Sequence, residues 1–180
     1  MISRTRLRYD SFHQVSGSSD LWVIVLTDEE RKNAVSVVCD DDMAVQLKMR
    51  ILNPEISRIM LPEALLQMLH SNYEMLIVGI YDGQYQVMLM DLENGESVRL
   101  RMSDAVLLSI ISKTPLYIED SLMQKQCYPC KDFTNGVAIP INSMDMAHLK
   151  HALAKAVEEE NYELASHLRD EIKQRKSNSE

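Results

Sequence analysis

The sequence has few of the features that mark secreted or membrane proteins. Only three of its 180 residues are cysteine, and such a sparse, odd number is more typical of a reducing compartment than of a disulfide scaffold. The longest uninterrupted apolar run, Leu21–Leu26, is far shorter than the roughly 20 residues that a membrane-spanning helix needs. No apolar stretch follows the charged N-terminal residues, so we expect no signal peptide. These observations predict a cytoplasmic protein without a membrane segment.

Glycine, proline and positive charge are also scarce. Five glycines and five prolines exclude a collagen-like or linker-dominated chain. The hydrophobic share of 46% and the charged share of 26% are those of a globular domain. Lys and Arg number 19 against 27 Asp and Glu, which gives a net charge of −8. Because phosphate contacts need cations, this acidic chain can bind nucleic acid only through a local basic patch or a metal ion.

Apolar segments separated by turn residues predict most of the secondary structure. Asp82-Gly83 and Asn94-Gly95 each predict a hairpin turn, since glycine adopts positive φ without penalty. Strands are predicted over residues 4–9, 21–27, 34–39, 73–81, 85–91 and 96–101. Helices are predicted over residues 43–51, 62–69 and 103–111, with Ser103 as the N-cap of the last.

The order of these segments repeats along the chain. A strand, a turn, a strand and an acid-led helix occur within residues 23–51 and again within residues 87–111. The pattern predicts an α+β domain of duplicated strand-strand-helix halves, with helices packed on a mostly antiparallel sheet. A chance likeness of the two halves explains the repeat equally well.

The C-terminal part of the chain has a different composition. Residues 146–176 contain neither glycine nor proline and predict a C-terminal α-helical hairpin. We therefore divide the chain into a domain over residues 1–123, a connector over 124–145, the hairpin over 146–176 and a tail over 177–180.

A first family resemblance lies in residues 98–118. The segment Arg101–Ala105 ends a strand and opens an apolar helix, and Thr114–Tyr117 follows as Thr-Pro-Leu-Tyr. This order resembles the bifunctional nuclease (BFN) domain family, in which Arg-Pro-Ser-Asp-Ala precedes the helix. Met102 replaces that proline, and Leu61–Ala64 stands where the family usually has Leu-Thr-His-Asp. The resemblance implies a small α+β domain, often a homo-oligomer, to which DNase and RNase activities are assigned.

The matching segment also carries candidate chemistry. Phosphodiester cleavage needs positive charge at the phosphoryl oxygens, and the amides of a helix N-terminus favour anions. Arg101, Ser103 and Asp104 are therefore our candidate catalytic residues. A helix cap at Ser103 and a dipole contact at Asp104 explain the same pair without catalysis.

Several other groups have both a functional and a structural interpretation. Arg4, Arg6 and Arg8 share one strand parity and, with Arg99, are our candidates for nucleic-acid binding. A charged edge strand explains the first three equally well. Asp40–Asp42 offers carboxylates that Mg²⁺ or Mn²⁺ prefers, although acidic residues also begin many helices. The sequence thus leaves three alternatives open for a cofactor: Mg²⁺, Mn²⁺ or no metal ion.

A lone Cys-x-x-C motif, Cys127 to Cys130, occurs in the connector. Zinc needs four ligands, and only His148 and His151 follow at a conceivable distance along the chain. A redox pair is the other functional interpretation. We favour a third interpretation over both of these, namely that Cys127 and Cys130 form no functional site.

A second resemblance covers residues 149–172. The stretch from Tyr162 to Ile172 reads Tyr-Glu-x-Ala-x-x-Leu-Arg-Asp-x-Ile and closely resembles the UVR motif. That motif is the helical hairpin of the excision-repair nuclease subunits B and C and of some Clp-associated regulators. Because about 30 residues bury little surface alone, we expect an apolar edge to pack on a similar hairpin or on the main domain. The candidate partner-binding residues are Leu149, Leu153, Tyr162, Leu168, Arg169 and Asp170.

Two functions follow from these features. The first is a nuclease-like protein that acts on DNA or RNA phosphodiester bonds and binds a protein through its hairpin. The alternative is a non-catalytic adaptor that recruits a repair or Clp-type partner through the same hairpin. The Arg-x-Ser-Asp segment favours the first function, whereas the net charge of −8 favours the second.

Overall fold

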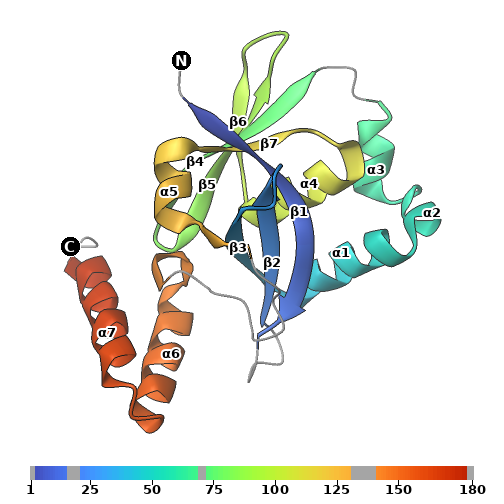
Figure 1. The fold of residues 1–180 in the computed structure, drawn as a ribbon. Helices are drawn as coiled ribbons and strands as arrows, with labels where there is room; N and C mark the ends of the chain where they lie inside the picture. The colour runs from blue at the N-terminus through green and yellow to red at the C-terminus, as the bar shows by residue number, and fades with distance from the viewer. Residues whose placement is uncertain (1–2, 16–20, 69–71, 131–140, 178–180) are drawn as a thin grey trace.

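The computed structural model describes residues 3–15, 21–68, 72–130 and 141–177 (Figure 1). The first half contains β1 (Arg4–Gln14), β2 (Leu21–Asp28), β3 (Asn33–Asp40), α1 (Asp41–Leu52), α2 (Pro54–Ser57) and α3 (Leu61–Leu66). The second half contains β4 (Tyr73–Tyr81), β5 (Gln84–Asp91), β6 (Ser97–Leu100), α4 (Met102–Ser112), β7 (Leu116–Glu119), α5 (Asp120–Gln126) and β8 (Tyr128–Pro129). A short 3₁₀ turn, η2 (Ile141–Ser143), precedes α6 (Met146–Glu158) and α7 (Tyr162–Ser177).

The strands form one sheet in the order β6-β5-β4-β7-β1-β2-β3-β8. Every neighbouring pair is antiparallel except β4 and β7, which run parallel. Two meanders, β1-β2-β3 and β4-β5-β6, thus lie on either side of β7, and a helix follows each of them. The predicted α+β fold with a mostly antiparallel sheet is confirmed, and both halves show the predicted strand-strand-helix order.

The sheet curls around α4. This helix contacts β5 near one end of the strand order and β3 near the other end, and it also touches β7. Its buried residues Met102, Ala105 and Val106 belong to the main hydrophobic core. Burial of these apolar side chains between α4 and the sheet is what stabilises the domain. The N-terminus of α4 consequently lies where the two ends of the sheet approach each other.

The start of α4 differs from the sequence prediction. The N-cap is Arg101, with φ −69° and ψ 147°, and not Ser103. The amide of Ala105 donates to the carbonyl of Arg101 at 3.0 Å, so the helical backbone begins at Met102. The prediction of Ser103 as the cap was wrong because the helix begins two residues earlier than a cap at Ser103 would place it. The Ser103 hydroxyl is therefore not used as the cap.

Several short elements were missing from the prediction, among them α5 and β8. Helix α5 follows β7 directly, and β8 pairs with β3 through Tyr128 opposite Ala34 and Pro129 opposite Asn33. Both are short, and neither has a run of apolar residues long enough to give a period. The beginning of the expected connector over 124–145 thus contributes the last strand of the sheet.

The C-terminal helices form the predicted hairpin. Helices α6 and α7 pack against each other around their own cluster of buried side chains, which shares no residue with the main core. Asn161 accepts a hydrogen bond from the Leu164 amide at 3.2 Å and so caps α7. Figure 1 shows this pair beside the sheet, with α6 nearer to it. Within the described ranges, no helix is long and apolar enough to cross a membrane.

Candidate functional site

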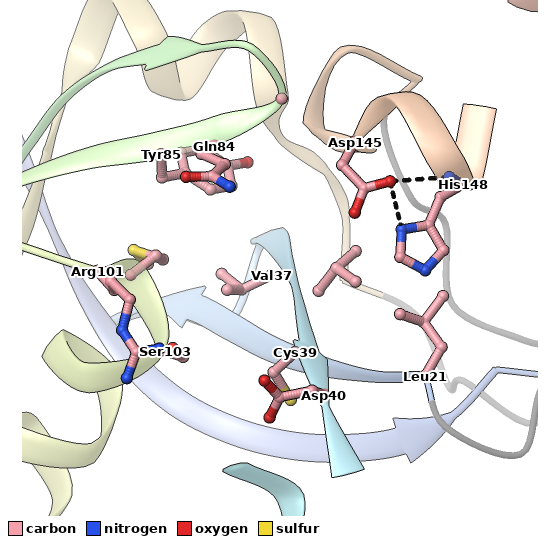
Figure 2. A pocket seen from close by; sticks show the side chains of 13 residues that line it. Leu21, Val37, Cys39, Asp40, Gln84, Tyr85, Arg101, Ser103, Asp145 and His148 are labelled. Carbon is pink, nitrogen blue, oxygen red and sulfur yellow. Dashed lines mark hydrogen bonds and ion pairs between the residues drawn. The ribbon is translucent and has the colours of Figure 1, made fainter. Parts of the chain in front are cut away.

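A pocket of about 350 Å³ opens between the two ends of the curled sheet (Figure 2). Four parts of the chain form it: the paired ends of β2 and β3, the start of β5, the start of α4 and the start of α6. Its lining residues are Leu21, Val37, Val38, Cys39, Asp40, Gly83, Gln84, Tyr85, Arg101, Met102, Ser103, Asp145 and His148. The pocket therefore joins the BFN-like segment to the first turn of the hairpin.

Two of the three candidate catalytic residues line this pocket. Arg101 and Ser103 lie at the beginning of α4, and no side chain in the described ranges caps this helix. The first amides of a helix have no partner within the helix and carry a partial positive charge. A pocket at such an end, with a guanidinium and a hydroxyl beside it, is suited to a phosphate group.

The third candidate, Asp104, acts on Arg101. Its two oxygens accept hydrogen bonds from Nε of Arg101 at 2.7 Å and from Nη2 at 3.0 Å. This bond, together with the charge of Asp104, raises the pKa of the Arg101 guanidinium above its ordinary value. Asp104 is not among the residues that line the pocket. It therefore orients Arg101 and does not reach a bound group itself.

Three further groups surround the pocket on the sides away from α4. Asp40 caps α1 by accepting the Met43 amide at 2.8 Å. Asp145 caps α6 by accepting the His148 amide at 2.8 Å, and the same oxygen lies 2.7 Å from Nδ1 of His148. Figure 2 shows Asp145 and His148 across the pocket from Arg101 and Ser103. Both carboxylates thus already face the positive end of a helix, which reduces their repulsion of an anion.

The inner wall of the pocket is apolar and contains two titratable groups in their neutral form. Burial, aided by the charge of Asp40, raises the pKa of the Cys39 thiol to about 12. Burial likewise raises the pKa of Tyr85, whose hydroxyl donates to Oε1 of Gln126 at 3.5 Å. Neither group is ionised at neutral pH, so the charged side chains of the pocket are Arg101, Asp40 and Asp145, beside the positive end of α4.

Arg4, Arg6 and Arg8 form a basic ribbon along β1, and this ribbon faces carboxylates. Arg4 pairs with Glu74 and lies 4.2 Å from the centre of the Tyr117 ring. Arg8 and Arg6 both approach Oε1 of Glu29, at 2.7 Å and 3.7 Å. None of these arginines lines the pocket, and neither does Arg99, which lies exposed on β6. The structure therefore does not bring the candidate nucleic-acid-binding residues together with Arg101 and Ser103.

The acidic and cysteine motifs do not form a metal cluster in the described ranges. No three His, Cys, Asp or Glu side chains there lie close enough to hold a metal ion together. Asp40 is a helix cap, and Asp41 accepts a hydrogen bond from the Trp22 indole at 3.0 Å. Cys127 and Cys130 are both free thiols. The described residues therefore show no ready-made cluster of metal ligands, and we route no chemical step through a metal.

The hairpin divides the candidate partner-binding residues into two groups. Leu149 and Leu168 are 0% and 1% exposed and, with Leu153 beside them, hold α6 and α7 together. Tyr162 is 68% exposed, and Arg169 and Asp170 are exposed and pair with each other at 3.1 Å. The exposed apolar side chains of the hairpin are Val157, Tyr162 and Leu164. A partner can reach this second set directly, but not Leu149 and Leu168.

Sequence reasoning did not assign Asp145 and His148 to this pocket. An Asp followed three residues later by His at a helix start is a visible capping pattern. The place of these two residues across the pocket from Arg101 depends on how the hairpin lies against the sheet, which no local pattern encodes. The expected homo-oligomer and the cytoplasmic location stay predictions.

Comparisons with known families agree with both resemblances. The sequence model of the bifunctional nuclease domain matches residues 24–131, and the model of the UvrB/UvrC (UVR) motif matches residues 147–176. Because the first match covers more than half of the chain, the protein belongs to the bifunctional nuclease domain family. It combines this nuclease-like domain with a motif associated with protein interaction. A search of curated proteins finds no match to the chain.

Proposed function

We propose that this protein binds DNA or RNA at the N-terminus of α4 and cleaves a phosphodiester bond there. The observation that carries the proposal is the pocket lined by Arg101 and Ser103, at a helix N-terminus without a side-chain cap among the described residues. Membership of the bifunctional nuclease domain family supports the same function.

Each residue of this site has a defined role in the proposal. The first amides of α4 and the Ser103 hydroxyl bind non-bridging oxygens of the phosphate. Arg101 stabilises the negative charge that grows on those oxygens during cleavage. Asp104 holds the guanidinium of Arg101 in one orientation through its two hydrogen bonds. The pocket thus supplies charge stabilisation and positioning.

The hairpin has a separate role. We propose that α6 and α7 recruit a protein partner of the excision-repair or Clp type, as the UVR motif implies. The exposed Tyr162 and Leu164 supply apolar contact, while Arg169 and Asp170 orient the partner through their charges. Partner recruitment would bring the phosphodiester site to its substrate.

The test is cleavage of fluorescently labelled single-stranded RNA and single-stranded DNA by the full chain, with either EDTA or Mn²⁺ present. We expect cleavage in at least one condition, and a loss of about 100-fold in kcat for Arg101→Ala because a charge-stabilising donor is removed. Ser103→Ala should weaken substrate binding. Arg58→Ala is the matched control, since this exposed arginine also pairs with a carboxylate three residues away but lies outside the pocket, and it should cleave like the unchanged protein.

The alternative function is the non-catalytic adaptor. What favours it is the neutralised basic ribbon, in which Arg4, Arg6 and Arg8 each face a glutamate. Absence of cleavage of both substrates in every condition, by protein with a cooperative unfolding transition, would overturn the nuclease proposal and support the adaptor. Equal rates for Arg101→Ala and Arg58→Ala would show that cleavage does not use this pocket.

A further inference from the structure

We propose that the UVR hairpin completes the nuclease site by supplying His148 as the catalytic proton acceptor. This inference rests on the proposed function, because it assigns the base for the same phosphodiester cleavage. The hairpin is then more than a recruiting element, since its first turn forms one wall of the pocket that contains Arg101 and Ser103.

The geometry of His148 is that of an oriented base. Nδ1 lies 2.7 Å from Oδ1 of Asp145, and the same oxygen accepts the backbone amide of His148 at 2.8 Å. A hydrogen bond from Nδ1–H to a carboxylate fixes the ring and leaves the lone pair on Nε2. Within the described ranges Nε2 has no partner of its own, and His148 lines the pocket. Asp145 is therefore a positioning residue and His148 the acceptor.

The hairpin is held in place at the turn between β4 and β5. A Cβ atom on Gly83 would come within 2.2 Å of the Met144 carbonyl oxygen and within 2.7 Å of Nη1 of Arg175. Met144 directly precedes Asp145, so this close approach fixes the start of α6 against the sheet. Only glycine permits both the contact and the φ of +76° found at this position.

Arg175 strengthens the same contact from α7. Its side chain is 9% exposed, and it donates to the carbonyls of Met144 at 2.5 Å and Asn142 at 3.0 Å. It also pairs with Glu171 at 2.8 Å and lies 3.9 Å from Asp82 in the turn. One buried cation thus links the end of α7, the segment before α6 and the β4–β5 turn. The position of Asp145 and His148 follows from this arrangement.

Water is the only reactant that the proposed cleavage step needs besides the phosphodiester. The oxygen of a water molecule forms a bond to phosphorus while one of its protons passes to Nε2 of His148. The bond from phosphorus to the leaving oxygen breaks, and that oxygen keeps the electron pair. The protonated imidazole then returns the proton to the leaving oxygen. Asp145 stabilises the positive charge that develops on the imidazole, and Arg101 stabilises the negative charge that develops on the phosphoryl oxygens. Asp40 is the other charged group of the pocket.

The first experiment compares His148→Ala with His151→Ala in the cleavage assay. A general base contributes typically about 100-fold or more, so we expect at least this loss in kcat for His148→Ala. His151 lies one turn further along α6, is exposed and is not part of the pocket, so its variant should keep full activity. Added imidazole should restore part of the rate of His148→Ala only, because a diffusible base replaces the missing ring.

The second experiment compares Gly83→Ala with Gly95→Ala. Both glycines have φ +76°, so both variants carry the same backbone strain. Among the described residues, nothing lies within 4 Å of a Cβ on Gly95, whereas a Cβ on Gly83 would collide with Met144. We expect Gly83→Ala to displace the hairpin and to lose most of the activity, while Gly95→Ala retains it at a temperature at which both are folded.

The outcomes separate this inference from the proposed function. Cleavage that depends on Arg101 but is equal in the His148→Ala and His151→Ala variants would overturn the inference and leave the proposed function standing. A loss in His148→Ala that imidazole does not restore would also overturn the role as a base. If the unchanged protein cleaves neither substrate, the proposed function fails, and this inference fails with it.

Discussion

Arg50 is an arginine buried in the domain at 4% exposure. Its Nε and Nη2 donate to the two oxygens of Glu63 at 2.6 and 3.0 Å, and Nη1 donates to Oε1 of Gln46 at 2.7 Å. These bonds link α1 to α3. A buried guanidinium is stable only when hydrogen-bond acceptors such as these pair with it, because transfer of an unpaired charge from water into the protein interior costs free energy.

Removal of Glu63 should therefore destabilise the protein strongly. We expect Glu63→Ala to lower the free energy of unfolding by about 3 kcal/mol, because Arg50 would remain buried without its carboxylate. The matched control is Glu55→Ala, which breaks the exposed pair between Glu55 and Arg58 and should cost less than about 1 kcal/mol. Urea unfolding followed by circular dichroism measures both, and equal values for the two variants would contradict the argument.

The buried thiol of Cys39 gives a prediction about pH. Burial raises the pKa of this group from 9.0 in the ordinary case to about 12. Below pH 9 the thiol is neutral in both the folded and the unfolded protein, so its contribution to stability is fully present there. Between pH 9 and about 12 only the unfolded state loses the proton, and the contribution is lost as pH rises. We expect stability to fall over this range, and less steeply in Cys39→Ala.

Alkylation supplies an independent check on the same thiol. Cys39 is buried, whereas Cys127 and Cys130 are partly exposed. Iodoacetamide at pH 8 should modify Cys127 and Cys130 in the folded protein and all three thiols in urea, because the thiolate is the nucleophile. Peptide mass mapping counts the modified sites. Equal labelling of Cys39 in both states would show that the thiol is accessible.

At the scale of residues, the sequence predicts the site only in part. The motif around Arg101 and Ser103 could be found because its residues are neighbours along the chain. His148 could not, since its place in the pocket depends on a contact between Gly83 and Met144 that joins distant segments. The apolar stripes of the two helices include Leu149 and Leu168, but such a stripe does not reveal which of its residues stay open to a partner, and both are buried.

Among the elements, strands bounded by turns were the easiest to predict. The β4 strand has the predicted bounds, Tyr73–Tyr81, since the Asp82-Gly83 turn fixes where the chain reverses. In contrast, β8 consists only of Tyr128 and Pro129 and is defined by its pairing with β3. Such a strand exists because of its neighbour and not because of its own pattern, so the sequence gives no signal for it.

The start of α1 offers a test of one element. Asp40 accepts the Met43 amide at 2.8 Å and is the N-cap, as the acidic run predicts. Asp40→Ala should lower the free energy of unfolding by about 1 kcal/mol because an amide at the helix end loses its acceptor. Asp40→Asn should remain close to the unchanged protein, since asparagine caps nearly as well. Thermal unfolding compares them, and an equal loss in both variants would mean that charge and not capping matters.

In the whole molecule, two clusters of buried side chains are joined by a small polar contact. The main cluster is formed by the sheet with α1, α4 and α5, and the second by α6 and α7 with the segment before them. The link between them is made by Gly83, Met144 and Arg175. Since hydrophobic burial dominates stability, we expect each part to keep most of its own stabilisation when they are separated.

Truncation of the chain after Asp145 tests this division. The shortened protein keeps every member of the main cluster, so we expect a cooperative thermal transition close to that of the full chain. It loses His148 and the Arg175 contacts, so cleavage should fall at least as far as in His148→Ala. Calorimetry and the cleavage assay measure the two effects on one sample. If the transition disappears, the hairpin is part of the folding unit, because a domain that depends only on its own core would survive the cut.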